Sequence, residues 1–245
     1  MKARSTAGVT LLEVLLAVSL LSLLVAGVVT AMRLGLNAMG QTNNRLMANR
    51  RVAGAQRILE QHLRSFMPVT AACSPGPGGP VTVVPFFQGE PDSLRFVSGY
   101  SLEEGARGYP RVVELHIIPG EGGRGVRLIV NEHLYSGPLS AGATCLGPAP
   151  DPLLGVVRLR FRPIEIGSSS FVLADKLESC RFLYQRPIPG PAQTEWLPLW
   201  AHPQWPRAIR VEMTPIEDTP ARLRPLSVTA SIRVNRAMEI RYGDY

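Results

Sequence analysis

The sequence is poor in cysteine, in lysine and in aromatic residues, and these shortages exclude several classes of protein. Three cysteines in 245 residues, none of them in a C-x-x-C pattern, exclude a zinc ribbon and a thioredoxin-like redox pair. Lys2 and Lys176 are the only lysines, so the net charge of +7 comes from arginines that are spread along the chain rather than gathered in one block. We interpret this charge as solvated surface and expect no nucleic-acid partner.

Motifs for catalysis and metal binding are absent from the sequence as well. The four histidines lack the spacing of metal ligands, and we expect each to lie at the surface or to have its hydrogen bonds satisfied. No G-x-S-x-G motif is present. Gly120–Gly125 match G-x-G-x-x-G, but a strand pattern follows where a dinucleotide site needs a helix, so these glycines predict a hairpin turn. We therefore expect no enzyme activity, no cofactor and no bound metal.

The N-terminus does have a long hydrophobic run. Residues 9–32 contain a single charge, Glu13, and residues 14–32 contain none. A helix needs about 20 apolar residues to cross a bilayer. Lys2 and Arg4 precede the run, and the positive-inside rule keeps that end in the cytoplasm. The sequence therefore predicts a single-pass helix, with the rest of the chain on the far side of the membrane.

Three ordinary interpretations leave part of this segment unexplained. A cleavable secretory signal could end near Val29–Met32, but its apolar run normally has about 7 to 15 residues, and this run is longer. A plain signal anchor fits the length and gives Glu13 no role. A buried core helix would hardly begin at the chain terminus behind two cations.

The stretch GVTLLEVLLA, residues 8–17, resembles the signature of type IV prepilins and type II secretion pseudopilins. In that signature a glycine is followed by an apolar residue, then Thr-Leu, an apolar residue, Glu-Val and a long hydrophobic run. Val9 departs from the family, which usually has phenylalanine there, but the family's prepilin peptidase is strict about the glycine and tolerant of the next residue. The resemblance implies a non-enzymatic, pilin-like protein of the bacterial inner membrane.

The resemblance also implies a role for each residue of the motif. Gly8 precedes the bond that prepilin peptidase cuts, and Val9 becomes a mature N-terminus that is N-methylated. Glu13 inside a membrane costs on the order of a few kcal/mol. In the family its partner is the terminal amine of a neighbouring subunit, so the two charges compensate one another only in the assembly. Residues 1–8 are then the leader, and residues 9–32 the transmembrane and assembly half of the helix.

The pattern turns amphipathic after the apolar run. Apolar residues recur close to a helical stripe, which predicts the second half of the helix at residues 33–67; they are Met39, Leu46, Val52, Ala55, Leu59, Leu63 and Phe66. Gly35, Gly40 and Gly54 are poor helix residues and leave room for a bend or local melting.

Beyond the helix, the breaker cluster at residues 73–80 is followed by segments that alternate with period two. About seven strands are predicted, at 81–87, 93–98, 113–117, 126–130, 157–161, 209–213 and 228–234. One long helix followed by half-buried strands predicts an α+β fold, in which the helix packs on an antiparallel sheet and residues 68–245 form a β-rich periplasmic domain.

If this domain lies outside the cytoplasm, one disulfide can form. Cys73 and Cys145 both lie in Pro/Gly-rich loop sequence and are the favoured pair, which leaves Cys180 free.

A second, more diffuse resemblance covers residues 81–236. An LLGV stretch at 153–156 leads into a strand, Tyr184 and two tryptophans follow, and a Pro-x-Ala strand lies at 206–211. This order is similar to the J-type minor pseudopilin of type II secretion systems, and to related minor pilins of type IV pili. It implies hetero-oligomeric assembly with other minor pseudopilins and the major pseudopilin. A membrane-tethered or secreted binding module remains the alternative from another class.

Overall fold

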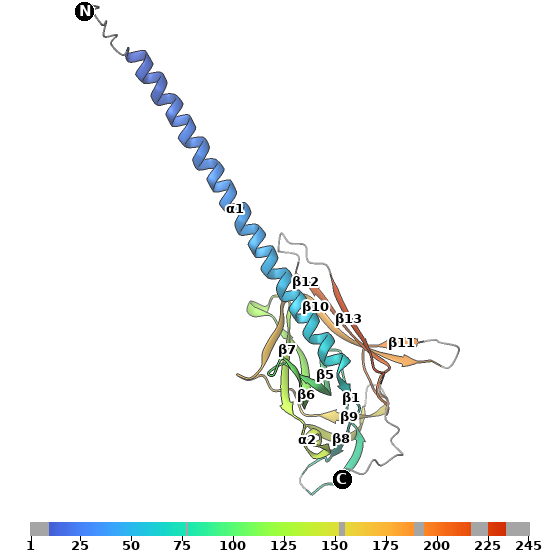
Figure 1. Ribbon diagram of the computed structural model, residues 1–245. Coiled ribbons are helices and arrows are strands. Elements are labelled where there is room, and N and C mark those ends of the chain that lie inside the picture. Colours follow the sequence, from blue (N-terminus) through green and yellow to red (C-terminus); the bar gives the residue numbers. More distant parts are fainter. Residues whose placement is uncertain (1–9, 77, 152–154, 189–193, 217–224, 234–245) are drawn as a thin grey trace, which may run out of the picture. The chain divides into compact units, whose positions relative to one another are not determined.

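The computed structural model describes residues 10–76, 78–151, 155–188, 194–216 and 225–233, with the backbone alone at 41, 44–49 and 51. The chain divides into two compact units, Met1–Asn49 and Arg50–Tyr245. A single helix, α1 (Leu11–Arg64), begins in the first unit and ends in the second (Figure 1). The predicted leader, residues 1–8, and Val9 lie outside the described residues.

Helix α1 forms because residues 11–64 contain no proline and are rich in leucine and alanine, which are strong helix formers. Gly35, Gly40 and Gly54 do not interrupt it: the backbone is helical at all three, and the local melting allowed for by the sequence does not occur. The helix ends at Arg64, so the prediction that it continues to residue 67 was wrong. Phe66 instead begins the first strand, β1, and Pro68 follows.

The second unit is built on a large antiparallel sheet with the path β1-β5-β6-β7-β10-β12-β13, to which β11 adds beside β10 and β4 beside β5. Two further hairpins, β2-β3 and β8-β9, lie outside this sheet. The strands are β1 (Phe66–Met67), β2 (Thr70–Cys73), β3 (Thr82–Pro85), β4 (Gln88–Gly89), β5 (Ser93–Ser101), β6 (Ala106–Pro119), β7 (Val126–Leu134), β8 (Cys145–Asp151), β9 (Val156–Phe161), β10 (Phe171–Pro187), β11 (Thr194–Leu197), β12 (Ala208–Pro215) and β13 (Leu226–Ser231). The short helices are η1 (Glu121–Gly123) and α2 (Pro138–Gly142). All seven predicted segments contain strand residues, and the predicted α+β fold is confirmed.

One face of the sheet packs against the last turns of α1, as Figure 1 shows within the second unit. Ala55, Leu59 and Leu63 recur at helical spacing, and all three are buried in one cluster with Phe96 of β5 and Val113 of β6. Burying a leucine side chain contributes roughly 1.5–3 kcal/mol, so this short stripe fixes the helix on the sheet. Of the predicted stripe, Met39 is exposed in the first unit, and the side chain of Leu46 lies outside those described.

The opposite face of the sheet is covered by the two hairpins and α2. Neighbouring residues of a strand point to opposite faces, so Val97 faces away from the helix where Phe96 faces toward it. Val97 and Val112 belong to a second buried cluster, together with Phe86, Ala141 and Cys145. The second unit therefore has three layers: helix, sheet and hairpins.

The glycine-rich segment between β6 and β7 is the predicted hairpin turn. The amide of Gly120 donates to the carbonyl of Gly125 at 2.8 Å, and the two strands pair antiparallel up to Pro119 and Val126. Gly125 has a φ of +65° and its added Cβ would lie 2.2 Å from the carbonyl oxygen of Leu177, so only glycine fits there.

Residues 171–187 form the long central strand β10, which is not among the seven strands predicted from the sequence. β10 pairs with β7 through its first half and with β12 through its second half. Three register shifts, at Val172/Ala174, Ala174/Leu177 and Leu177/Ser179, interrupt the alternation of inward and outward side chains. Because of these bulges, apolar and polar residues of β10 do not alternate regularly, and the sequence pattern does not indicate a strand.

Candidate functional site

Helix α1 begins with a local arrangement that involves the only charge of the apolar run. The amide of Glu13 donates to the carbonyl of Thr10 at 3.1 Å and lies 3.4 Å from the hydroxyl oxygen of Thr10. A threonine that precedes a helix, with glutamate three residues later, has the spacing of a capping box. The carboxylate also lies in the first turn, where the helix dipole favours a negative charge. Glu13 therefore lies where a carboxylate favours the start of a helix, besides any role toward another molecule.

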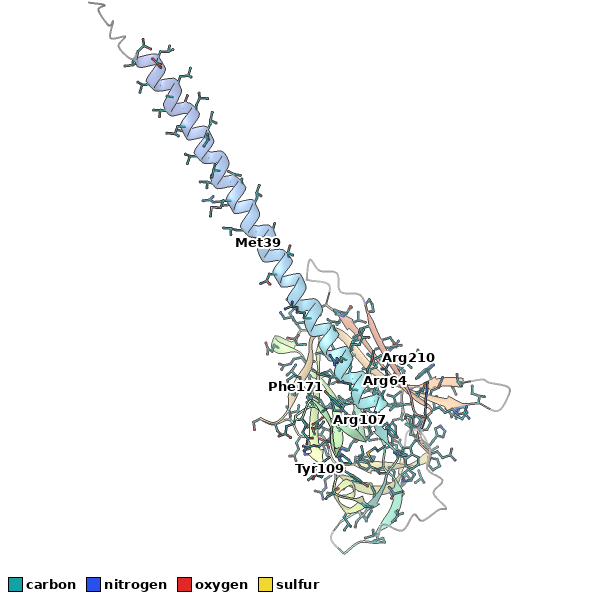
Figure 2. The ribbon with its side chains drawn as sticks, in the orientation of Figure 1. Met39, Arg64, Arg107, Tyr109, Phe171 and Arg210 are labelled. Atoms are coloured by element: carbon teal, nitrogen blue, oxygen red, sulfur yellow. A yellow bond between two sulfur atoms is a disulfide. The ribbon has the colours of Figure 1, made fainter. Side chains whose placement is uncertain are left out.

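The following turns are apolar on every side. Leu11–Gly40 is long enough to cross a membrane, and an 18-residue window within it has a mean hydropathy of 2.6. None of its side chains is buried within the structure, and Figure 2 shows them around the whole circumference of the helix, with Met39 near the end of the apolar part. The hydroxyls of Ser22 and Thr30 donate to carbonyls four residues earlier, at 2.8 Å, which satisfies them within the helix. The segment therefore meets the physical requirements of a membrane-spanning helix.

Of the three motif residues expected to act in processing and assembly, the structure describes Glu13 alone, since Gly8 and Val9 lie outside the described residues. The Glu13 side chain is exposed, and no ion pair is found for it within the part of the chain that the structure describes. Its charge is therefore available to a group outside the described chain.

The disulfide of the second unit joins the two cysteines favoured from their loop sequence. Cys73 at the end of β2 and Cys145 at the start of β8 are bonded, with their Cα atoms 5.1 Å apart. Both are buried in the cluster beneath the two hairpins. Cys180 on β10 carries a free thiol, and burial raises its pKa to about 12, so it is a poor nucleophile.

His62 departs from the expectation for the histidines. It lies in the last turn of α1, its side chain is fully buried, and its ring nitrogens make no hydrogen bond with the described residues. Burial lowers its pKa to about 4, so the ring is neutral at neutral pH, although Oε1 of Glu132 is 3.3 Å from Nε2. The other histidines are partly exposed, and no group of three His, Cys, Asp or Glu side chains in the described ranges is placed to hold a metal ion.

A buried polar network between the sheet and the hairpin layer was not predicted from the sequence. Nε of Arg95 donates to Oε1 of Glu114 at 2.7 Å, and Nη1 donates to Oε1 of Gln88 at 2.5 Å. Nη2 of Arg95 reaches the carbonyl of Arg162 at 3.2 Å, which ties the segment after β9 to the sheet. Burial lowers the pKa of Arg95, but Glu114 opposes this shift and the guanidinium keeps its charge. These contacts hold the hairpin layer on the sheet, and we refer to Arg95, Glu114 and Gln88, together with the Arg162 carbonyl, as the buried clamp.

A cavity of about 320 Å³ lies beside this network, between β3, β4, β9 and the segment around Trp200. Aromatic and proline side chains supply much of its wall: Phe87, Phe161, Trp200, Pro85, Pro148 and Pro203. Trp200 is fixed by two hydrogen bonds, from its indole nitrogen to the carbonyl of Gln204 at 2.6 Å and from its amide to the carbonyl of Gly89 at 2.7 Å. Only glycine fits at Gly89, because a Cβ would lie 2.7 Å from that of Trp200.

Two charged side chains line the cavity, Arg158 and Glu90, and they pair with one another. Arg158 donates to Glu90 at 2.8 Å through Nη1 and to Asp151 at 2.6 Å through Nε. His202 also lines the cavity, and burial together with the nearby Arg186 lowers its pKa, so it is neutral at neutral pH. The cavity thus offers a largely apolar, aromatic wall in which Arg158 is already paired with carboxylates, and this suits an uncharged apolar ligand.

Comparison with known proteins adds no further constraint, since no family model matches the chain and no curated protein matches it.

Proposed function

We propose that this chain is a minor pseudopilin, a structural subunit of the tip of a type II secretion pseudopilus. The observation that carries the proposal is the fixed spacing of Gly8, Val9 and Glu13 at the head of an apolar helix. The α+β fold, in which the last turns of that helix pack on an antiparallel sheet, supports it. In this proposal the helix is anchored in the bacterial inner membrane and the second unit lies in the periplasm. A minor pilin of a type IV pilus would share all of these features.

The position of Glu13 in the apolar span implies a way in which neighbouring subunits could pair. A carboxylate in an apolar span is unfavourable alone and becomes tolerable when a cation is brought to it. Cleavage after Gly8 would create a new amine at Val9, four residues before Glu13. An amine of one processed subunit and the Glu13 carboxylate of its neighbour would then compensate one another, and the pairing would set the register of the two helices.

Variants at the helix start separate the assembly role of Glu13 from its capping role. Glu13→Gln keeps a residue that can complete a capping box but removes the charge, whereas Thr10→Ala removes the cap and keeps the charge. Glu60→Gln is the matched control, because Glu60 also lies on α1 and forms a partly exposed pair with Arg64. The measurement is affinity purification of the tagged full chain from its native host, with quantification of co-purified proteins that carry the same leader pattern.

We expect Glu13→Gln to reduce recovery of such proteins about tenfold, and Thr10→Ala and Glu60→Gln to reduce it less than twofold. Equal recovery with Glu13→Gln and wild type would contradict the charge-pairing role. Loss with Thr10→Ala but not with Glu13→Gln would assign Glu13 to helix capping alone.

A membrane-tethered or secreted binding module is the second candidate, and the aromatic cavity is the observation in its favour. Such a protein would need an anchor or a signal but no Gly8 cleavage and no paired Glu13. The two functions are therefore distinguished at the N-terminus and not at the cavity.

A further inference from the structure

We propose that the outer edge of β9 and the neighbouring cavity bind an extended, uncharged segment of a partner protein. The segment would add to β9 as a strand and place an apolar side chain in the cavity. This inference goes beyond the proposed function and does not rest on it, because it concerns the second unit alone.

The edge of β9 is open in the described part of the chain. β9 pairs with β8, and no other described strand pairs with it. Val156 and Val157 at its start are 43% and 63% exposed, although valine favours the half-buried surface of a sheet. An unpaired edge that carries exposed apolar side chains is a template for another strand.

Alternate residues of β9 connect this edge to the cavity. Val157, Leu159 and Phe161 are two residues apart, so they share one face of the strand, and all three line the cavity. A strand added to β9 would lie about 4.8 Å away, and its alternate side chains would stand beside these three on the same face. The main chain of the segment would then be recognised by β9 and its side chains by the cavity.

The cavity wall defines the chemistry of those side chains. Phe161 contacts Phe86 edge to face at 5.9 Å between ring centroids, and Trp200 contacts His202 at 4.8 Å, which leaves rigid aromatic surfaces. Arg158 is already bound to Glu90 and Asp151, so an anionic ligand would have to break an existing pair. A volume of about 320 Å³ is small among ligand sites, which span about 300–1,000 Å³. An aromatic or proline side chain on an uncharged extended segment meets these conditions.

The test uses the full chain in detergent and a fluorescein-labelled, end-blocked hexapeptide of alternating threonine and phenylalanine. Binding is followed by fluorescence anisotropy. A second probe is the same peptide with alternate amides N-methylated, so that it cannot complete the ladder of main-chain hydrogen bonds. A third probe is acetyl-phenylalanine amide, which has the side chain without the extended backbone. Val157→Asp places a charge at the cavity wall, and Val172→Asp is its matched control at an exposed valine on β10 that does not line the cavity.

We expect saturable binding of the peptide that weakens at least tenfold with N-methylation and with Val157→Asp, and changes less than twofold with Val172→Asp. Circular dichroism checks that both variants fold. The proposal would be overturned by the absence of saturable binding or by equal loss in both variants. Binding of acetyl-phenylalanine amide as tight as that of the peptide would indicate a small-molecule site and would also overturn it. A dimer of the chain that Val157→Asp abolishes would assign the edge to a second copy and would overturn it as well.

Discussion

Arg95 and Glu114 form the most deeply buried ion pair between residues that the structure describes, with side chains 1% and 5% exposed and 2.7 Å between Nε and Oε1. The pair lies on the face of the sheet turned away from α1. Asn131 completes it by donating through Nδ2 both to Glu114 at 3.3 Å and to the carbonyl of Glu165 at 2.9 Å. Charged and amide groups therefore hold the segment between β9 and β10 to the sheet.

Removal of one partner of this pair should be strongly destabilising, because the other charge would remain buried without compensation. For Glu114→Ala we expect a loss of about 3–5 kcal/mol in the free energy of unfolding, measured by denaturant titration of the detergent-solubilised chain. Arg181→Ala is the control. Its pair with Glu212 is largely exposed, so the expected loss is below about 1 kcal/mol. Equal losses in the two variants would contradict the structural importance of the buried clamp.

His62 should make the second unit less stable in acid. Its pKa is about 4 in the folded chain and near 6.5 when unfolded, so between these values the unfolded chain binds the proton and the folded chain does not. Stability attributable to His62 is thus complete above pH 6.5 and decreases as the pH falls toward 4, by up to about 3 kcal/mol.

The measurement is the free energy of unfolding at pH 7.5 and at pH 4.5, for wild type and for His62→Phe. Phenylalanine is neutral at both values and keeps an aromatic ring beside Tyr100, whose ring centroid lies 4.9 Å from that of His62. We expect a smaller difference between the two pH values in the variant. The same difference in both proteins would show that His62 does not control the acid sensitivity.

Loss of the disulfide should destabilise the hairpin layer. The bond joins residues 72 apart in sequence, and a loop of that length corresponds to about 4 kcal/mol in the chain-entropy account. The Cys73→Ala/Cys145→Ala double variant should therefore unfold at a markedly lower denaturant midpoint than wild type. Cys180→Ala is the control and should retain the disulfide. A double variant as stable as wild type would contradict the stabilising role of the bond.

Much of this fold follows from local pattern. Val113, Leu115 and Ile117 alternate with polar residues, and β6 contains all of them. Ala55, Leu59 and Leu63 have helical spacing, and they are the residues of α1 that meet the sheet. In α1 the period of the sequence and the period of burial agree, whereas β6 is covered on both faces, so its alternation predicts the strand while Glu114 is buried along with Val113 and Leu115.

Other parts could not be predicted because the deciding interactions are not local. Lys176 on β10 has a φ of +53°, and the bulges around it break the alternation that would reveal a strand. Arg95 alternates with Leu94 and Phe96, which is the pattern of a residue that faces solvent. It is buried because the hairpin layer covers that face of the sheet, and no local pattern in the sequence indicates this layer. The cavity joins β3, β9 and the segment around Trp200, which are far apart in sequence, so no motif signals it. The burial of His62 was missed for the same reason, because its neighbours Glu132 and Tyr100 belong to β7 and β5, which are distant in sequence.

The central claim concerns the bond between Gly8 and Val9, and the mass of the mature N-terminal peptide tests it most directly. The full chain is purified from its native host and compared with a Gly8→Val variant, with Gly35→Ala as a control at a helix glycine that has no atoms within 4 Å of the added Cβ. We expect the wild type and Gly35→Ala chains to begin at Val9 with one added methyl group, and the Gly8→Val chain to retain its leader. A wild-type chain that begins at Met32, as after a conventional signal, or that keeps residues 1–8 intact would contradict the account.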